Sequence, residues 1–217
     1  MIVGVNACAS FLSIAHFSPE ASGGITVPAN NNVEQLPQLL DDYLTQHHIQ
    51  LTGLCTVLGP GSYTGTRLAL TTLKMLGVVH KIPLFGASLF QVYMYSVTGI
   101  LNELVILTSH SRKGMLNVQV MQSSDSSWAP VSSILQLSMA EFSAFLKKFK
   151  DPVAWHHIGD PLLVEMAETH ALPQPLNTEC NVMAYLKVVY HSVSSGEMPP
   201  KRLAPIYAAP AVVVSAS

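Results

Sequence analysis

The part of this sequence best suited to chemistry is a glycine-rich loop between a predicted strand and a predicted helix. It reads GPGSYTGTR and spans residues 59–67. Glycine permits positive φ angles and close approach of a ligand to the backbone, and a helix N-terminus offers free N–H groups and the positive end of a dipole. The loop is therefore a candidate anion-binding site. Its candidate residues are Gly59, Gly61, Ser62, Thr64, Gly65 and Arg67.

The spacing of this loop differs from the common phosphate and nucleophile motifs. A P-loop needs a lysine at a position where this loop has none, and a dinucleotide fingerprint that starts at Gly59 would need glycine at Thr64. A nucleophile elbow centred on Ser62 would need glycine at both Pro60 and Thr64. The alternative interpretation is structural: a tight strand-to-helix turn in which Ser62 or Thr64 caps the helix.

The remaining chemistry-bearing residues do not favour a metal site or a hydrolase. The histidines at 47–48 and 156–157 are adjacent pairs. Adjacent side chains point in different directions on a helix or a strand, so these pairs do not easily chelate one ion. His110, Ser111 and Asp125 have the residue types of a hydrolytic triad, but sequence alone does not establish its geometry. We expect no catalytic residue and no metal ligand.

An alternation of strands and helices must position the loop. Hydrophobic periodicity predicts strands over residues 2–7, 11–17 and 25–27, a helix over 33–48, a strand over 54–58, a helix over about 65–80, a strand over 84–86 and a helix over 88–96. This βββ-α-β-α-β-α order is typical of a ribonuclease-H-like or actin-like lobe. In such a lobe an antiparallel meander is followed by parallel strands that crossover helices connect.

The second half of the sequence predicts a second, abridged lobe. Its expected strands cover residues 104–107, 116–121 and 153–157, and its expected helices cover 138–149, 161–170 and 179–193. We place the boundary near residue 102, which gives an N-terminal lobe over 1–102 and a C-terminal lobe over 103–217, with a tail that could pack back on the first lobe. The predicted fold class is α/β, two-lobed and actin-like, with a mixed sheet flanked by helices in each lobe.

Composition excludes several classes of protein. The chain has 217 residues, of which 11% are charged and 49% hydrophobic, and its net charge is -2. The charged fraction is under half the roughly 25% usual for soluble domains, yet the apolar content excludes disorder and is enough for a core. The 11 Lys and Arg residues are thinly spread, so we expect contact with nucleic acid only through a partner.

The same composition bears on where the protein resides. No uncharged apolar stretch reaches the 18 residues of a membrane span, and residues 1–17 resemble strands more than a signal peptide. The three cysteines are widely spaced and form no C-x-x-C motif, which favours a reducing cytosol. We expect a cytoplasmic protein without a membrane segment.

The string GPGSYTGTR, with IPLFGAS at residues 82–88, is similar to the signature of the bacterial TsaB (YeaZ) family of tRNA threonylcarbamoyladenosine biosynthesis proteins. The βββ-α start, SRKG at 111–114 and Pro-Ile-Tyr at 205–207 extend the resemblance over most of the chain. The resemblance implies an actin-like, two-lobed fold similar to sugar kinases and to the catalytic paralogue TsaD. It also implies a non-catalytic subunit.

The resemblance implies a set of partners as well. With TsaD and the ATPase TsaE, such proteins support transfer of a threonylcarbamoyl group to the adenosine 3′ to the anticodon. We therefore expect a heterodimer with a TsaD-like paralogue and a TsaE-like ATPase in a larger complex. A homodimer is possible when the chain is alone, and tRNA is contacted only through the complex.

Departures from the family pattern argue against nucleotide chemistry. Asn6 stands at the end of the first strand where relatives carry aspartate, and a neutral amide is a poor substitute at a Mg²⁺-phosphate site. Three asparagines at 30–32 replace the family's His-Ser-Glu start of the first helix, and the H-x-x-x-H metal pair of the paralogue is missing. We expect weak or no nucleotide binding and no cofactor.

The first two helices are the candidate partner surface. The helix over 65–80 is apolar nearly all round, so it is buried on more than one side, either within its own lobe or against another protein. The resemblance favours the second possibility, because TsaB-like proteins join TsaD through a helical bundle of their N-terminal lobes. The candidate interface residues are Val33, Leu36, Leu40, Tyr43, Leu44, His47, Leu68, Thr72, Met75, Leu76 and Val79.

Three functional hypotheses follow. The leading one is a non-catalytic TsaB-like subunit that binds and supports TsaD, which also suits a surface with so few charges. The alternative is an actin-like ATPase or small-molecule kinase that uses the Gly59–Gly65 loop. A remote alternative is a peptidase of the glycoprotease-like superfamily.

Overall fold

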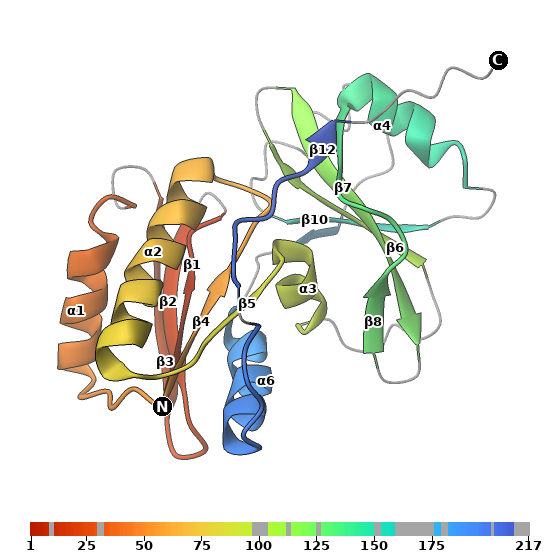
Figure 1. The fold of residues 1–217 in the computed structure, drawn as a ribbon. Coiled ribbons are helices and arrows are strands. Elements are labelled where there is room, and N and C mark those ends of the chain that lie inside the picture. Colours follow the sequence, from red (N-terminus) through yellow and green to blue (C-terminus); the bar gives the residue numbers. More distant parts are fainter. Residues whose placement is uncertain are drawn as a thin grey trace. The chain divides into compact units, whose positions relative to one another are not determined.

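The computed structural model describes residues 1–8, 11–29, 33–96, 104–111, 114–124, 127–149, 153–158, 176–178, 182–200 and 202–210. The chain forms two compact units (Figure 1). Unit 1 consists of Met1–Ser96 and Cys180–Ile206, and unit 2 consists of Val97–Glu179 and Tyr207–Ser217. Each unit contains a mixed sheet flanked by helices, so the predicted α/β fold class is confirmed.

The sheet of unit 1 has the strand order β3-β2-β1-β4-β5. Its strands are β1 (Ile2–Asn6), β2 (Phe11–Phe17), β3 (Ser22–Pro28), β4 (Gly53–Val57) and β5 (Leu84–Ala87). The first three strands pair antiparallel, whereas β4 lies parallel to both β1 and β5. The predicted meander followed by parallel crossover strands is confirmed.

Two of the helices of unit 1 cover one face of this sheet. They are α1 (Leu36–Gln46) and α2 (Tyr63–His80), and they pack on the face formed by Val3, Val5 and Leu54. The predicted helical pattern starts at Val33, and helix α1 begins three residues later, at Leu36. Its second residue is proline, which is tolerated in the first turn because the missing N–H would have no helical partner there. Helix α3 (Leu89–Met94) starts with a capping box between Ser88 and Gln91.

A helix from the end of the sequence covers the other face. Helix α6 (Val182–Ser194) packs against β1, β2 and β4. A Cβ atom at Gly4 of β1 would lie 2.9 Å from Cδ2 of Leu186, so the close approach of α6 requires glycine there. Because α6 packs on this sheet, unit 1 consists of two chain segments, one that ends at Ser96 and a second from Cys180 to Ile206. The sequence prediction was a single boundary near residue 102, with a tail that could pack back on the first lobe.

Unit 2 is built on a second mixed sheet with the order β11-β10-β6-β7-β9-β12, in which β8 also pairs with β7. Its strands are β6 (Leu104–His110), β7 (Met115–Ser124), β8 (Ser127–Pro130), β9 (Leu135–Ser138), β10 (Ala154–Ile158), β11 (Leu176–Thr178) and β12 (Ala209–Pro210). Helix α4 (Met139–Leu146) buries Phe142 edge-on against Trp155 at a ring distance of 4.9 Å. The helix predicted over 161–170 lies outside the described residues.

Candidate functional site

The glycine-rich loop joins β4 to α2, as the sequence predicts. Its entry is fixed by two backbone hydrogen bonds: the N–H of Leu58 donates to Ala87 at 2.9 Å, and the N–H of Leu89 donates to Gly59 at 2.7 Å. Gly59 has a φ of +107°, a conformation that side chains with a Cβ rarely adopt, and the peptide bond that follows it is cis. The loop is thereby tied to β5 and to the start of α3.

Three glycines of the loop are required by neighbouring backbone. A Cβ atom at Gly61 would overlap the carbonyl oxygen of Cys8, and one at Gly65 would overlap that of Ala7. A Cβ atom at Gly59 would lie 2.5 Å from the carbonyl oxygen of Ile206, in the C-terminal part of unit 1. Close packing of the chain against itself explains these glycines without any ligand.

Three of the backbone amides that could cradle an anion are already hydrogen-bonded within the chain. The N–H of Ser62 donates to the Cys8 carbonyl at 2.8 Å, and the N–H of Thr66 donates to the Ser62 carbonyl at 3.0 Å. The N–H of Gly65 donates to the Ser62 hydroxyl at 3.1 Å, which makes Ser62 the cap of α2. The structure thus selects Ser62 between the two predicted caps. A phosphate here would meet the carbonyl oxygens of Ala7 and Cys8, and these three amides would not be free to bind it.

Asn6 and Cys8 form a buried support beneath the loop. The Oδ1 atom of Asn6 accepts a hydrogen bond from the N–H of Cys8 at 3.0 Å, so the side chain shapes the turn after β1. The thiol of Cys8 donates to the carbonyl of Val57 at 3.2 Å and lies 3.2 Å from the hydroxyl of Thr66. Burial raises the pKa of the Cys8 thiol to about 11, so it is a protonated packing group and not a nucleophile.

The structure brings together most of the predicted loop residues, but Arg67 lies apart from them. Its guanidinium carbon lies 3.7 Å from the centre of the Tyr63 ring on the exposed side of α2. This is a cation–π geometry. Thr64 is also exposed. Neither side chain is positioned with the buried Asn6–Cys8 support, and the chemistry of the loop is that of a structural turn.

The candidate interface residues divide into two groups by burial. Leu36, Leu40 and Tyr43 are buried in the core of unit 1, because they lie on the side of α1 that packs against the sheet. These three cannot contact a partner directly, which corrects the sequence prediction. Val33, Leu44, Leu68, Thr72 and Leu76 are half-buried, and His47, Met75 and Val79 are exposed.

We define the α1–α2 face as Leu44, His47, Thr72, Met75 and Val79. Within it, Met75 is 66% exposed and Val79 is 72% exposed. These two residues are four apart on α2, so their side chains are neighbours on the helix surface and form an apolar patch. The α1–α2 face therefore combines the exposed His47, Met75 and Val79 with the half-buried Leu44 and Thr72.

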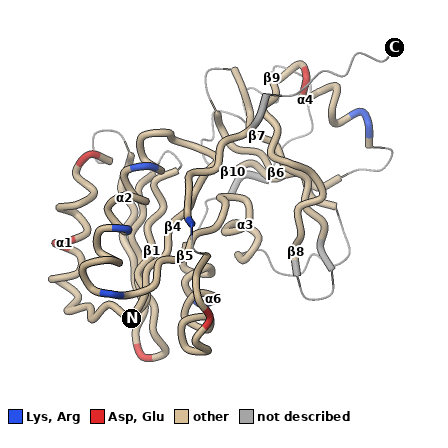
Figure 2. The backbone as a smooth tube through the Cα atoms, viewed as in Figure 1, with Lys and Arg blue, Asp and Glu red and all other residues tan. Residues whose placement is uncertain are grey.

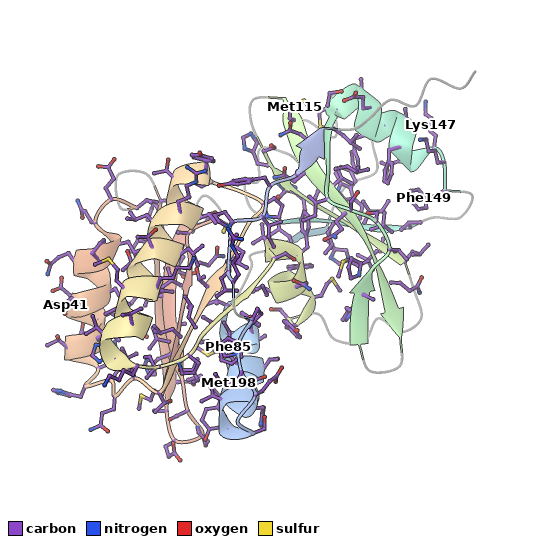
Figure 3. The ribbon with its side chains drawn as sticks, in the orientation of Figure 1. Asp41, Phe85, Met115, Lys147, Phe149 and Met198 are labelled. Atoms are coloured by element: carbon purple, nitrogen blue, oxygen red, sulfur yellow. The ribbon has the colours of Figure 1, made fainter. Side chains whose placement is uncertain are left out.

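Charge is segregated between these two helices (Figure 2). Helix α1 carries Asp41 and Asp42, with Asp41 projecting away from the sheet in Figure 3, whereas α2 carries only Arg67 and Lys74. The sequence contains no Asp or Glu from residue 43 to residue 102. One helix of the pair therefore presents carboxylates and the other cations, a pattern that favours oriented contact with a partner.

Sequence reasoning missed a polar cluster on the buried side of α1. The Nδ1 atom of His16, on β2, lies 2.7 Å from the hydroxyl of Tyr43, and the rings of His16 and His47 are 5.3 Å apart. Burial, the neighbouring His47 and the N-terminal ammonium all lower the pKa of His16. The signal in the sequence is a histidine that follows the buried Ile14 and Ala15 in β2. The contact between His16 and Tyr43 joins α1 to the sheet.

In the parts of the chain that the structure describes, no group of three or more His, Cys, Asp and Glu side chains is arranged to hold a metal ion. Among the helices in those same parts, none combines the length and the apolar character needed to cross a membrane.

Comparison with known proteins adds a family and a fold. A family model described as "TsaD: tRNA N6-adenosine threonylcarbamoyltransferase" matches residues 11–126, more than half of the chain. The structure is similar to "YeaZ from Pseudomonas aeruginosa", with a TM-score of 0.69 and 15% identity over 95% of this chain and 99% of that chain.

A second solved structure shows the same likeness. A structure of "an uncharacterized protein with similarity to peptidase YEAZ from Pseudomonas aeruginosa" matches with a TM-score of 0.68 and 15% identity, over 95% of this chain and 98% of that chain. No curated protein sequence matches the chain. At this identity the structural likeness establishes the fold, and the family match rests on the sequence.

Proposed function

We propose, from the premise that this chain belongs to the TsaD family of tRNA N6-adenosine threonylcarbamoyltransferases, that it is a TsaB-type, non-catalytic subunit in tRNA modification. Its role is to bind a TsaD-like catalytic paralogue and support it during synthesis of threonylcarbamoyladenosine. A TsaE-like ATPase joins the same complex, and tRNA is contacted only there. The observation that carries the proposal is the uncovered α1–α2 face on a chain of this family and fold.

The glycine-rich loop supports a non-catalytic role. The amides of Ser62, Gly65 and Thr66 are committed to hydrogen bonds, and carbonyl oxygens of Ala7 and Cys8 crowd the loop. A Mg²⁺-nucleotide site needs free donors for phosphate and carboxylates for the metal ion. Among the described residues, three amides of this loop are engaged and the loop itself contains no carboxylate, so its geometry does not favour the ATPase or kinase alternative or the peptidase alternative.

The α1–α2 face is suited to a helical bundle with the paralogue. Met75 and Val79 lie one turn apart on α2 and supply apolar contact area, and Thr72 lies on the same side of this helix. Asp41 and Asp42 of α1 are exposed and orient whatever docks there. When the chain is alone, a second copy related by a two-fold axis would use the same apolar face, which gives a homodimer.

Co-elution with the cognate TsaD-like protein tests the proposal. We expect a complex at micromolar concentrations, and we expect Val79→Glu to weaken it at least tenfold because it places a charge in the apolar centre of the contact. Val131→Glu is the matched control, since Val131 is an exposed valine in unit 2. Absence of a complex with the folded wild-type chain, or equal weakening by both variants, would refute the proposal.

A further inference from the structure

The opposite flank of α2 carries a second surface, formed with the C-terminal part of unit 1. We call residues 196–200 and 202–206 the strap. The ammonium of Lys74 donates a hydrogen bond to the carbonyl of Leu203 at 2.8 Å, and the N–H of Ile206 donates to the carbonyl of Leu58 at 2.6 Å. The strap is thus attached both to α2 and to the loop that precedes it.

Two cavities lie along the strap and share Ile82: one lies between the strap, α2 and β5, and the other between the strap, the turn after α2 and Val193 of α6. The first, of 330 Å³, is lined by Lys74, Gly77, Val78, Ile82, Leu84, Pro200 and Leu203. The second, of 480 Å³, includes Lys81, Pro83 and Met198 in its lining. We call the two together the α2–strap groove. Most of its lining is aliphatic or proline, so it suits apolar side chains.

The rim of the groove combines exposed apolar residues with cations. Among the described residues, Met198 (labelled in Figure 3) and Val78 are the most exposed large hydrophobic side chains, at 82% and 79%. Lys74 and Lys81 are both exposed and lie seven residues apart, which is two helical turns or about 10 Å. The lining residues include a single carboxylate, Glu197, in the second cavity.

We propose that the α2–strap groove docks an acidic amphipathic segment of a second partner protein. Apolar side chains of that segment fill the groove against Val78 and Ile82, and its carboxylates face Lys74 and Lys81. A nucleic acid fits less well. Its phosphates would use two cations and leave Val78 and Met198 without apolar contact.

This surface is separate from the α1–α2 face. Val78 and Val79 are consecutive residues of one α-helix, so their side chains project about 100° apart around the axis. Val79 belongs to the face beside α1, and Val78 lines the groove beside the strap. The two surfaces therefore share no side chain, and the inference goes beyond binding of the paralogue.

Fluorescence anisotropy with three labelled probes tests the proposal on the full chain. The probes are a 16-residue peptide with leucines on one helical face and glutamates flanking them, the same peptide with lysines in place of the glutamates, and a 16-nucleotide single-stranded RNA. We expect the acidic peptide to bind in the micromolar range and the other two at least tenfold more weakly. A preference for RNA or for the basic peptide would overturn the proposal.

Substitutions in the α2–strap groove test whether the acidic peptide binds there. Lys81→Asn removes one cation without touching the strap, and asparagine tolerates the left-handed conformation at this position, where φ is +56°. Combined with Lys74→Gln it should weaken binding of the acidic peptide fivefold to tenfold, as should Val78→Ser alone. Lys187→Gln on α6 is the matched control and should leave binding unchanged.

The outcomes separate this proposal from the proposed function. Val79→Ser should leave the peptide affinity unchanged, whereas Val78→Ser should leave co-elution with the TsaD-like protein unchanged. Absence of peptide binding by the wild-type chain, or equal loss in Val78→Ser and Val79→Ser, would overturn the groove proposal whatever the co-elution shows.

Discussion

Replacing Gly61 with alanine should destabilise unit 1 by about 2–4 kcal/mol. The φ angle of Gly61 is not in the left-handed region, so backbone strain is not the cause. The added Cβ atom would overlap the carbonyl oxygen of Cys8, which is backbone and cannot rotate away. Overpacking of this kind costs about 1–3 kcal/mol, and loss of the Ser62 N–H to Cys8 hydrogen bond adds about 0.5–1.5 kcal/mol.

Urea denaturation followed by far-ultraviolet circular dichroism measures the effect. At a typical slope of about 2 kcal/mol per molar urea, the midpoint should fall by about 1–2 M. Trp155 lies in the core of unit 2, so its fluorescence serves as an internal reference for that unit. The circular dichroism midpoint should shift more than the fluorescence midpoint.

Gly77→Ala is the matched control. Gly77 lies inside α2, and a Cβ atom there would lie 3.3 Å from the carbonyl oxygen of Ile82, a tight contact that a shift of a few tenths of an ångström relieves. Alanine is favoured over glycine within a helix by about 1 kcal/mol, which offsets this contact, so the variant should shift the midpoint far less than Gly61→Ala. If Gly61→Ala leaves the midpoint unchanged, the glycine is not required by close packing and a ligand-binding reason must be sought.

Two further predictions concern titratable groups. The lowered pKa of His16 means that the unfolded chain binds more protons than the folded chain below about pH 6.5, so the stability from this group is complete above that pH and is lost as the pH falls. His16→Gln keeps a neutral partner for Tyr43 and should reduce the dependence of the melting temperature on pH between pH 5 and 7. An unchanged pH dependence would contradict the assignment. The Cys8 thiol is buried and its pKa is about 11, so it should resist iodoacetamide at pH 7.5 in the folded chain and react in 6 M guanidinium. Peptide mass spectrometry measures the extent of labelling. Rapid labelling of the native protein would contradict the burial of Cys8.

The sequence by itself determined the elements and their order. Alternating and helical hydrophobic patterns depend on neighbours within one strand or one helix, and they predicted β1 to α3 in sequence order with only the ends misplaced. The cap of α2 was narrowed to two residues for the same reason, since capping is local. The short strands β8 and β9 were missed because four residues carry little periodicity.

Only the tertiary structure decided what those elements do. The loop glycines could have been required by a bound ligand or by close packing of the chain. The carbonyl groups of Ala7, Cys8 and Ile206 decide for packing, and these residues are distant from the loop in sequence. The return of α6 to the first sheet, and the burial of Leu36, Leu40 and Tyr43, depended likewise on contacts between segments far apart in the chain. Local sequence patterns predict which side chains are buried, but only the tertiary structure shows which segments of the chain cover them. On α2, the packing of the strap places Val78 in the lining of a cavity, whereas the next residue, Val79, is exposed and is not part of that lining.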